Sequence, residues 1–340
     1  MTSGITHHVT ESDRHRTAWR EAGPVGGRLI IFLHGWPELG LVWDPQLEHF
    51  AARGWRCIAP DMRGYGGSSA PSDIAAYAVR EIVADMIELH DALGSAPAVW
   101  VGHDWGAPIA WGIAAHHAER CLCVAGICVP YFARGLTLDA LVPLVDRDVY
   151  PVDRFPVGQW DYWLYHRDRF ERSARDLEAN VPNTITTLYR RGRPRVVGKP
   201  VAMASIRAEN GWFGSAGVAP TMSRDENFMS QAAFDTVVKA FVETGFRGAN
   251  AWYLNDAPNA AFAAEAPDFG RLSMPTLFIH AAEDGVCDTL YTRLADPMRA
   301  ACANLTEVTV ECGHTVSLEA PDALNAAIEH WVAEQSIGIA

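Results

Sequence analysis

The chain has 340 residues, of which 49% are hydrophobic and 20% are charged, a composition typical of a globular protein rather than a disordered one. Its formal charge of −13 at pH 7 argues against nucleic acid or an anionic membrane as the main partner, because both need a basic surface. The sequence contains no run of 18 apolar residues that could span a bilayer.

The first residues, MTSGITHHVTESDRHRTAW, are polar and contain no apolar segment typical of a secretory signal. The seven cysteines are an odd number, and most of them lie within apolar runs, which favours buried reduced thiols over a disulfide framework. We therefore expect a cytoplasmic protein.

Short apolar runs closed by turn residues predict buried parallel strands along the chain. These runs cover residues 28–35, 55–61, 98–102, 122–129, 276–281 and 305–311. Helical patterns separate several of them, most clearly at residues 79–93 and 106–118. Alternation of strands and helices predicts an α/β fold with a mostly parallel, doubly wound sheet.

The alternation stops between about residues 131 and 271. This region is rich in Trp, Tyr, Arg and Pro and contains helical patterns at residues 168–180 and 231–245. An insertion at the carboxyl edge of a parallel sheet lies over the place where ligands bind in open α/β folds. We therefore predict a core domain of residues 1–130 and 272–340, and an inserted, mainly helical cap domain of residues 131–271.

The stretch GHDWG, residues 102–106, follows a predicted strand and opens a predicted helix. It has the Gly-x-nucleophile-x-Gly form of a nucleophile elbow, with Asp104 in the position that serine usually holds. A carboxylate attacks acyl carbon poorly, but it can displace a leaving group from an sp³ carbon and form an alkyl ester that water then cleaves. This chemistry predicts an epoxide or alkyl halide substrate. The alternative is that Asp104 only caps the helix.

Two other loops support the catalytic interpretation. HGWP, residues 34–37, follows the first predicted strand, where the amide of Trp36 could contribute to an oxyanion hole. The amide of Trp105, directly after the nucleophile, would be the second donor. The glycine-rich loop of residues 61–71 lies at another strand end and is a weak signal by itself.

His314 and Asp284 complete a candidate triad. His314 follows the last predicted strand and Asp284 follows the one before it, so the chain order is nucleophile, acid, histidine. We expect His314 to activate the hydrolytic water and Asp284 to orient its imidazole. Glu283 and Asp288 are close enough in sequence to be alternatives to Asp284.

With these residues identified, the chain resembles the α/β-hydrolase fold family, and within it the epoxide hydrolases, from about residue 26 to about residue 331. The motifs that carry the resemblance are HGWPE, DMRGYGGSSAP, GHDWGAPIAW, GFRGANAWYLN and ECGH. The resemblance implies conversion of an epoxide to a vicinal diol by a cofactor-independent hydrolase. It also implies that the hydroxyls of two cap tyrosines, Tyr162 and Tyr253, donate protons to the epoxide oxygen.

The chain departs from the family pattern at Trp163, where Gln is common, and at Thr315, where an aromatic residue is frequent. We expect Trp36, Trp105 and Trp163 to contact the substrate. The structural alternative for these tryptophans is core packing. The same alternative holds for the two tyrosines, because the predicted cap contains other tyrosines: Tyr131, Tyr150, Tyr165 and Tyr189.

The nearest alternative function is a haloalkane dehalogenase, in which the Trp105 indole would bind halide. A second halide donor is then expected near position 36, where this chain has Trp36. A haloacid dehalogenase ranks last, because no arginine follows the nucleophile closely. A non-catalytic protein that binds a hydrophobic ligand is less favoured.

We expect no metal and no cofactor. The adjacent histidine pairs at residues 7–8 and 116–117 cannot both face one site on a regular element. The expected partners are a small hydrophobic epoxide and water, and the sequence is compatible with a homodimer.

Overall fold

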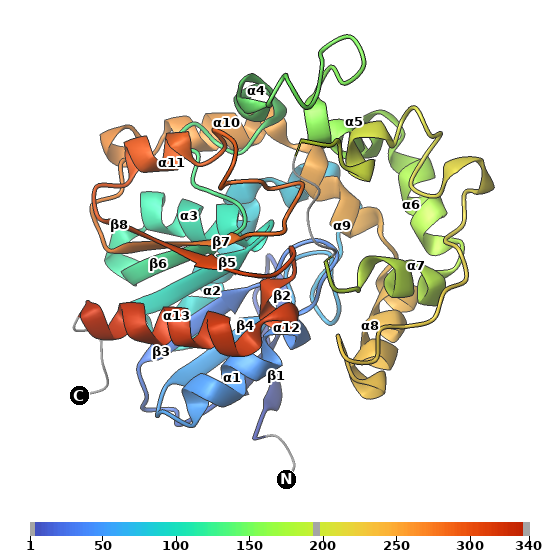
Figure 1. Cartoon of the computed structure of the whole chain (residues 1–340). Coiled ribbons are helices and arrows are strands. Elements are labelled where there is room, and N and C mark those ends of the chain that lie inside the picture. The colour runs from blue at the N-terminus through green and yellow to red at the C-terminus, as the bar shows by residue number, and fades with distance from the viewer. Residues whose placement is uncertain (1–3, 193–197, 336–340) are drawn as a thin grey trace.

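The computed structural model describes residues 4–192 and 198–335, and their core is one eight-stranded sheet flanked by helices (Figure 1). The strands are β1 (Thr6–Glu11), β2 (Arg16–Ala22), β3 (Leu29–Leu33), β4 (Arg56–Pro60), β5 (Ala98–His103), β6 (Cys121–Ile127), β7 (Thr276–Ala281) and β8 (Leu305–Val310). Their spatial order is β1-β2-β4-β3-β5-β6-β7-β8. The predicted α/β-hydrolase fold is confirmed.

The sequence analysis missed the two N-terminal strands. β1 pairs with β2, and β2 with β4, in antiparallel fashion, while the other neighbouring strands are parallel. β3, β5 and β7 are buried along their whole length, which explains their continuous apolar runs. β1 is mostly exposed and β2 alternates between exposed and buried residues, so neither forms such a run.

Helices cover both faces of the sheet. α1 packs against β4 and α13, whereas α3 packs against β5, β6 and α2. In α2 the buried apolar residues are Val79, Ile82, Val83, Met86 and Leu89, the spacing of an amphipathic helix with one face on the core. The helices of the core are α1 (Asp44–Ala51), α2 (Val79–Ala92), α3 (Gly106–His116), α11 (Asp296–Ala301), α12 (Val316–Glu319) and α13 (Pro321–Glu334).

The segment between β6 and β7 is mainly helical, and α5 to α9 lie together beside the sheet, on the right of Figure 1. Its helices are α4 (Leu138–Leu141), α5 (Asp161–Asp168), α6 (Phe170–Glu178), α7 (Val181–Leu188), α8 (Gln231–Thr244), α9 (Arg247–Ala251) and α10 (Asp256–Ala264). No helix among the described residues is long and apolar enough to cross a membrane.

Helix α10, which the sequence division assigns to the cap, packs on the core. The Val79 amide of α2 donates to Asn259 Oδ1 at 2.8 Å, and Phe262 stacks on His116 of α3 with ring centroids 3.8 Å apart. The boundaries at residues 131 and 271 therefore stay a prediction. Parts of both predicted domains, residues 1–3, 193–197 and 336–340, lie outside the described residues.

A buried ion cluster ties the N-terminal strands to α2. Asp85 of α2 is fully buried and accepts two hydrogen bonds from the Arg63 guanidinium, at 2.7 and 2.5 Å. Arg14, in the turn between β1 and β2, donates to the same carboxylate at 2.5 Å. Because Arg63 is itself only 5% exposed, its charge depends on Asp85 for compensation.

We predict that Asp85→Ala lowers the free energy of unfolding by about 3–5 kcal/mol, because it leaves a buried guanidinium without its carboxylate. Urea denaturation followed by far-UV circular dichroism measures the change. The control is Glu265→Ala, which removes the partner of the exposed Arg80 and should leave the unfolding midpoint unchanged. Equal effects of the two substitutions on the free energy of unfolding would contradict the stabilising role of the buried Asp85 carboxylate.

Candidate active site

Asp104 lies at the tip of a tight turn between β5 and α3. Its backbone φ is 49°, in the left-handed region that non-glycine residues rarely adopt and that costs about 1–3 kcal/mol. The turn can close because its flanks are glycines: a Cβ on Gly102 would lie 2.3 Å from the Gly106 carbonyl oxygen. Asp104 does not cap α3, since Trp105 holds the N-cap position and makes no side-chain cap hydrogen bond.

The Asp104 carboxylate contacts the loop after β3 and the loop after β8. The backbone N–H of Trp36 donates to Asp104 Oδ1 at 2.7 Å, and His314 Nε2 lies 3.5 Å from Oδ2. Glycine is required at position 35, because a Cβ there would lie 2.3 Å from Asp104 Oδ1. The structure thus brings the Trp36 amide to the Asp104 carboxylate. No hydrogen bond between the Trp105 amide and this carboxylate is present among the described residues.

His314 lies between two carboxylates. Its Nδ1 is 2.6 Å from Asp284 Oδ2, opposite the nitrogen that faces Asp104. Asp284 follows β7, and its Oδ1 accepts hydrogen bonds from the amides of Val286 and Cys287, both at 3.0 Å. Among the three acidic residues of this loop that the sequence offered, Asp284 is the one that reaches the imidazole.

Burial and pairing act in opposite directions on the pKa values of these groups. Burial alone would lower the pKa of His314, but the charge of Asp284 and the hydrogen bonds to Asp104 and Asp284 raise it well above 6.5. Burial would raise the pKa of Asp104, but the hydrogen bond and charge of His314 lower it below its usual value. The pKa of Asp284 is lowered in the same way. The site therefore holds two carboxylates and one imidazolium.

The two predicted tyrosines lie on separate cap segments and meet at the same cavity as Asp104. Tyr162 is on α5, Tyr253 is on the short 3₁₀ helix η8 (Trp252–Leu254), and their ring centroids are 5.6 Å apart. Burial raises the pKa of both phenols well above 10, so both carry their proton at neutral pH.

The hydroxyls of the other cap tyrosines have partners within the protein, although the Tyr189 side chain lines the same cavity as Asp104. The Tyr131 hydroxyl donates to the Gly270 carbonyl and the Tyr165 hydroxyl to Asp176, at 2.7 and 2.6 Å. The Tyr189 hydroxyl donates to the Pro37 carbonyl at 2.6 Å, and the Tyr150 hydroxyl accepts from the Val201 amide at 3.4 Å. These bonds separate the four tyrosines from Tyr162 and Tyr253.

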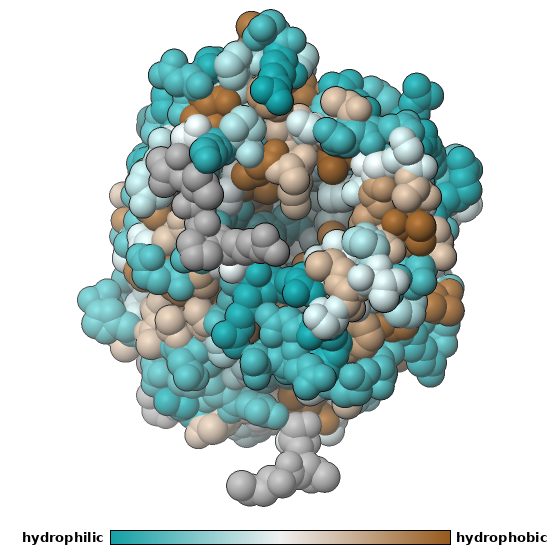
Figure 2. Space-filling view, turned by 45° about the vertical axis from the view of Figure 1, so that its right-hand side comes forward, coloured by the Kyte–Doolittle hydropathy of each residue, from teal (hydrophilic) through white to brown (hydrophobic). Residues whose placement is uncertain are grey.

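The cavity that Asp104 and His314 both line, called the main cavity below, has a volume of about 190 Å³ and lies where the cap meets the carboxyl end of the sheet. Figure 2 shows a hollow near the centre of one face of the molecule, framed by apolar and polar residues. The cavity wall includes the predicted residues Trp36 and Thr315 and two residues that the sequence analysis did not identify, Met203 and Trp212.

Trp105 and Trp163 line a narrower pocket that continues from Asp104 and the two tyrosines. The rings of these tryptophans lie 5.2 Å apart, and each is also 5.2 Å from the Tyr253 ring. The Trp36 indole N–H instead donates to Asn250 Oδ1 at 3.0 Å. The Trp36 indole N–H is therefore already used in a hydrogen bond within the protein.

A second buried ion pair, between Glu38 and His103, contacts the backbone of His314. His103 Nδ1 lies 3.1 Å from Glu38 Oε2, and His103 Nε2 lies 2.8 Å from the backbone carbonyl oxygen of His314. Burial lowers the pKa of His103, but the charge of Glu38 outweighs it and raises the pKa to about 10. The sequence analysis missed this pair, although both residues lie within motifs that it quoted, HGWPE and GHDWG.

Two groups of described residues place three metal-ligating atoms within 4.8 Å of one another: His103, Cys128 and His314, and Asp284, Cys287 and His314. Both groups use His314, which is already paired with Asp284. Of the adjacent histidine pairs, His116 stacks on Phe262 and His8 on Trp19. The described cysteines are all free thiols.

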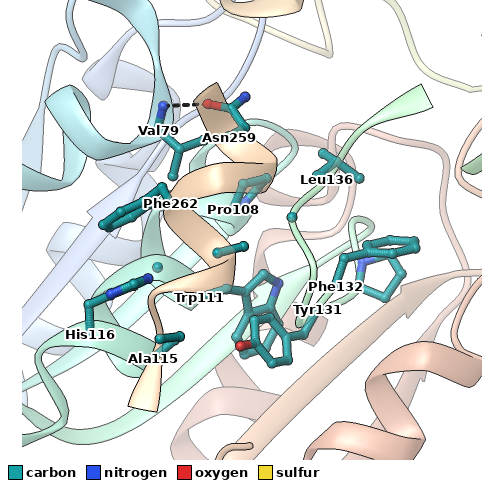
Figure 3. Close-up of a pocket in the computed structure, with 15 residues that line it drawn as sticks. Val79, Pro108, Trp111, Ala115, His116, Tyr131, Phe132, Leu136, Asn259 and Phe262 are labelled. Carbon is teal, nitrogen blue, oxygen red and sulfur yellow. Dashed lines mark hydrogen bonds between the residues drawn. The ribbon is translucent and has the colours of Figure 1, made fainter. Parts of the chain in front are cut away.

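A separate apolar crevice lies between α3, α10 and the loop after β6 (Figure 3). Trp111, Tyr131, Phe132 and Phe262 line it, and the hydrogen bond from Val79 to Asn259 closes one side. Neither Asp104 nor any other member of the triad faces this crevice. Acid–base and nucleophilic groups thus gather at the main cavity.

Comparisons with known proteins identify the family of the chain. The family model for the alpha/beta hydrolase fold matches residues 28–321. Epoxide hydrolase A of Mycobacterium tuberculosis is 32% identical over 324 residues, covering 95% of this chain and 96% of that protein. An epoxide hydrolase of Caballeronia sordidicola is 32% identical over 306 residues, covering 89% and 83%.

Solved structures of epoxide hydrolases are also similar to this chain. Epoxide Hydrolase A from Mycobacterium thermoresistibile is similar with a TM-score of 0.78 and 27% identity, covering 97% of this chain and 98% of that one. An epoxide hydrolase from an endophytic Streptomyces has a TM-score of 0.77 and 26% identity, covering 97% and 96%.

We predict that Asp104→Asn lowers the pKa of His314, because the substitution removes one of the two carboxylates that stabilise the imidazolium. NMR titration of isotope-labelled histidines measures the pKa, and comparison with His314→Gln assigns the signal. An unchanged His314 pKa would contradict the inferred charge arrangement.

The same shift predicts a pH dependence of stability. A histidine with a raised folded-state pKa stabilises the fold fully below its unfolded pKa, about 6.5, and the contribution is lost as pH rises through the folded-state pKa. The free energy of unfolding should therefore fall less steeply with pH above about 6.5 in Asp104→Asn than in the native protein. Parallel urea titrations across this range test the difference.

Proposed function

Since the chain belongs to the α/β-hydrolase fold family and, within it, to the epoxide hydrolases, we propose that it converts an epoxide to a vicinal diol through an alkyl ester on Asp104. The observation that carries the proposal is the pairing of an aspartate at the nucleophile elbow with two tyrosine hydroxyls across the same cavity. An alkoxide leaving group is strongly basic and needs a proton donor, which halide does not.

In the first step an Asp104 oxygen attacks an epoxide carbon. The ring C–O bond breaks, its electron pair stays on oxygen, and Tyr162 or Tyr253 donates a proton to that oxygen. The product is a hydroxyalkyl ester of Asp104 and a phenolate. The raised pKa values of both phenols support this role, because the donors are protonated before the reaction begins.

In the second step His314 activates water. Alkylation has neutralised Asp104, so one of the charges that held the His314 proton is gone and its pKa falls. Transfer of that proton through cavity water to the phenolate restores the tyrosine and leaves His314 neutral.

His314 then takes a proton from water as the water oxygen attacks the ester carbonyl carbon. The amides of Trp36 and Trp105 are the proposed oxyanion donors. The tetrahedral intermediate breaks the bond between its carbon and the diol oxygen, and that oxygen takes up the proton of the hydroxyl that water added. Asp104 thereby regains its carboxylate, and His314 keeps the proton it took from water, which restores the imidazolium. Asp284 keeps the imidazole oriented throughout.

The main cavity favours a compact, largely apolar epoxide. Its wall includes Trp36, Trp212, Met203 and Val286, and the narrower pocket beside it adds Trp105 and Trp163. Such walls bind hydrocarbon substituents by burying apolar surface and leave the oxygen to the tyrosine hydroxyls.

The haloalkane dehalogenase alternative is less well supported. A dehalogenase would need a second halide donor besides the Trp105 indole, and the Trp36 indole N–H at the expected position is bonded to Asn250. Incubation with 1-bromobutane should therefore release no bromide at a rate comparable to the opening of 1,2-epoxybutane. A non-catalytic binding protein would not need the His314–Asp284 pair.

We assign the protein to the cytoplasm, with the free thiols of the described cysteines as support. A homodimer stays a prediction.

The ester route predicts where the oxygen atoms go. In a single turnover in ¹⁸O water, with enzyme in excess over epoxide, the first diol should carry no label because its new oxygen comes from Asp104. The label should appear in the Asp104 side chain, which peptide mass spectrometry detects. Label in the first diol would refute the covalent route.

We predict that Tyr162→Phe and Tyr253→Phe each slow ester formation about 10²-fold or more, since each removes a proton donor. Rapid-quench mass spectrometry measures the rate. The matched control is Tyr165→Phe on the same helix, whose hydroxyl is bonded to Asp176 and should affect stability but not the rate. A full rate in both single variants would contradict the donor roles.

A further inference from the structure

A chain of buried side-chain hydrogen bonds runs from the core into the cap. The Trp36 indole N–H donates to Asn250 Oδ1 at 3.0 Å, Asn250 Nδ2 donates to Ser173 Oγ at 3.3 Å, and Ser173 Oγ lies 2.7 Å from His166 Nδ1. Trp36 follows β3, whereas Asn250, Ser173 and His166 belong to α9, α6 and α5. The three cap side chains are fully buried.

The donor at the Trp36 end fixes the direction of the first two of these hydrogen bonds. An indole nitrogen can only donate, so the Asn250 oxygen must accept and its amide nitrogen must donate onward. Ser173 Oγ accepts that bond, and the direction of its hydrogen bond with His166 Nδ1 follows from the imidazole tautomer. Burial lowers the pKa of His166 to about 3 and keeps the imidazole neutral.

The series of hydrogen bonds ends at His166, whose ring packs against Tyr253. The His166 ring stacks on the Tyr253 ring with centroids 4.6 Å apart and an interplanar angle of 15°. Trp36 contacts both rings edge-on, 5.5 Å from His166 and 6.2 Å from Tyr253. A neutral imidazole supports the phenol ring without adding a positive charge that would favour its ionised form.

We propose that Asn250, Ser173 and His166 form a positioning network that holds the Tyr253 hydroxyl at a fixed place relative to Asp104. The network begins on the residue whose backbone amide binds the Asp104 carboxylate, and it ends on the ring that carries the proton donor. This inference rests on the proposed function, because it assumes that Asp104 and Tyr253 act on the same epoxide.

The network has a physical reason to act as a unit. The nucleophile Asp104 lies on the core and the acid Tyr253 lies on the cap. An error of about 1 Å in the distance between them can lower the rate about 10²-fold. Apolar packing alone tolerates small shifts of one helix relative to another. A series of directional hydrogen bonds between buried side chains does not tolerate them. Breaking one link leaves buried donors and acceptors unpaired on both sides of the break.

The test removes the middle link with Ser173→Ala, which deletes one oxygen at a position that does not line the cavity. Ester formation is measured by rapid-quench mass spectrometry with 1,2-epoxybutane and with 4,4,4-trifluoro-1,2-epoxybutane, whose alkoxide is less basic and depends less on the acid. We expect a loss of about 10-fold to 10²-fold with the first epoxide and a clearly smaller loss with the second.

The matched control is Thr184→Val on α7. It also removes a fully buried cap hydroxyl, one that donates to the Leu177 carbonyl at 2.8 Å and takes no part in the network. This variant should lose stability without changing the ratio of the two rates. If Ser173→Ala does not fold, His166→Phe keeps a ring on Tyr253, removes the hydrogen-bond partner of Ser173, and should show the same selective loss.

An unchanged rate, or equal losses with both epoxides, would overturn the proposal, because a general loss of packing slows both substrates alike. If the native enzyme forms no ester with either epoxide, the proposed function itself fails and this inference fails with it. A native enzyme that forms the ester, together with variants that lose no selectivity, would remove only the positioning network.

Discussion

The imidazole of His314 lies between the carboxylates of Asp104 and Asp284, and its charge allows both acids to stay ionised in a buried site. A buried carboxylate without a partner would cost several kcal/mol or take up a proton, and a protonated Asp104 is no nucleophile. In the proposed mechanism, esterification of Asp104 removes one of the two charges that hold the His314 proton. The arrangement that stabilises the resting site would therefore also prepare the proposed base for the second step.

The fold brings these groups together from distant parts of the chain. Asp104, Asp284 and His314 each follow a parallel strand, β5, β7 or β8, so the sheet places all three at one edge. The cap then adds two buried tyrosines, Tyr162 and Tyr253, which line the same cavity as Asp104 and are the proposed proton donors. Asp104 lies on the core and the two tyrosines lie on the cap. Contacts between cap and core therefore decide whether these groups can act on the same epoxide.

The sequence predicted the elements whose signals are local. The elbow at Asp104, the buried runs and the order of the triad follow from short patterns, and the predicted fold is confirmed. Strands β1 and β2 were missed because exposed polar residues interrupt their patterns. The buried polar pairs Glu38–His103 and Trp36–Asn250 were missed because their partners are far apart in sequence and no local period marks them. Tyr162 and Tyr253 came from resemblance, since aromatic residues in a cap are mostly packing.

The central claim is that carbon becomes bonded to Asp104, and the most direct measurement is peptide mapping of the trapped ester. His314→Gln removes the base of the second step, so incubation with 1,2-epoxybutane should leave the ester in place. The account predicts a protein whose mass increases by one whole epoxide, with the added mass on the peptide that contains Asp104. An unmodified Asp104 peptide in a variant that still consumes the epoxide would contradict the account.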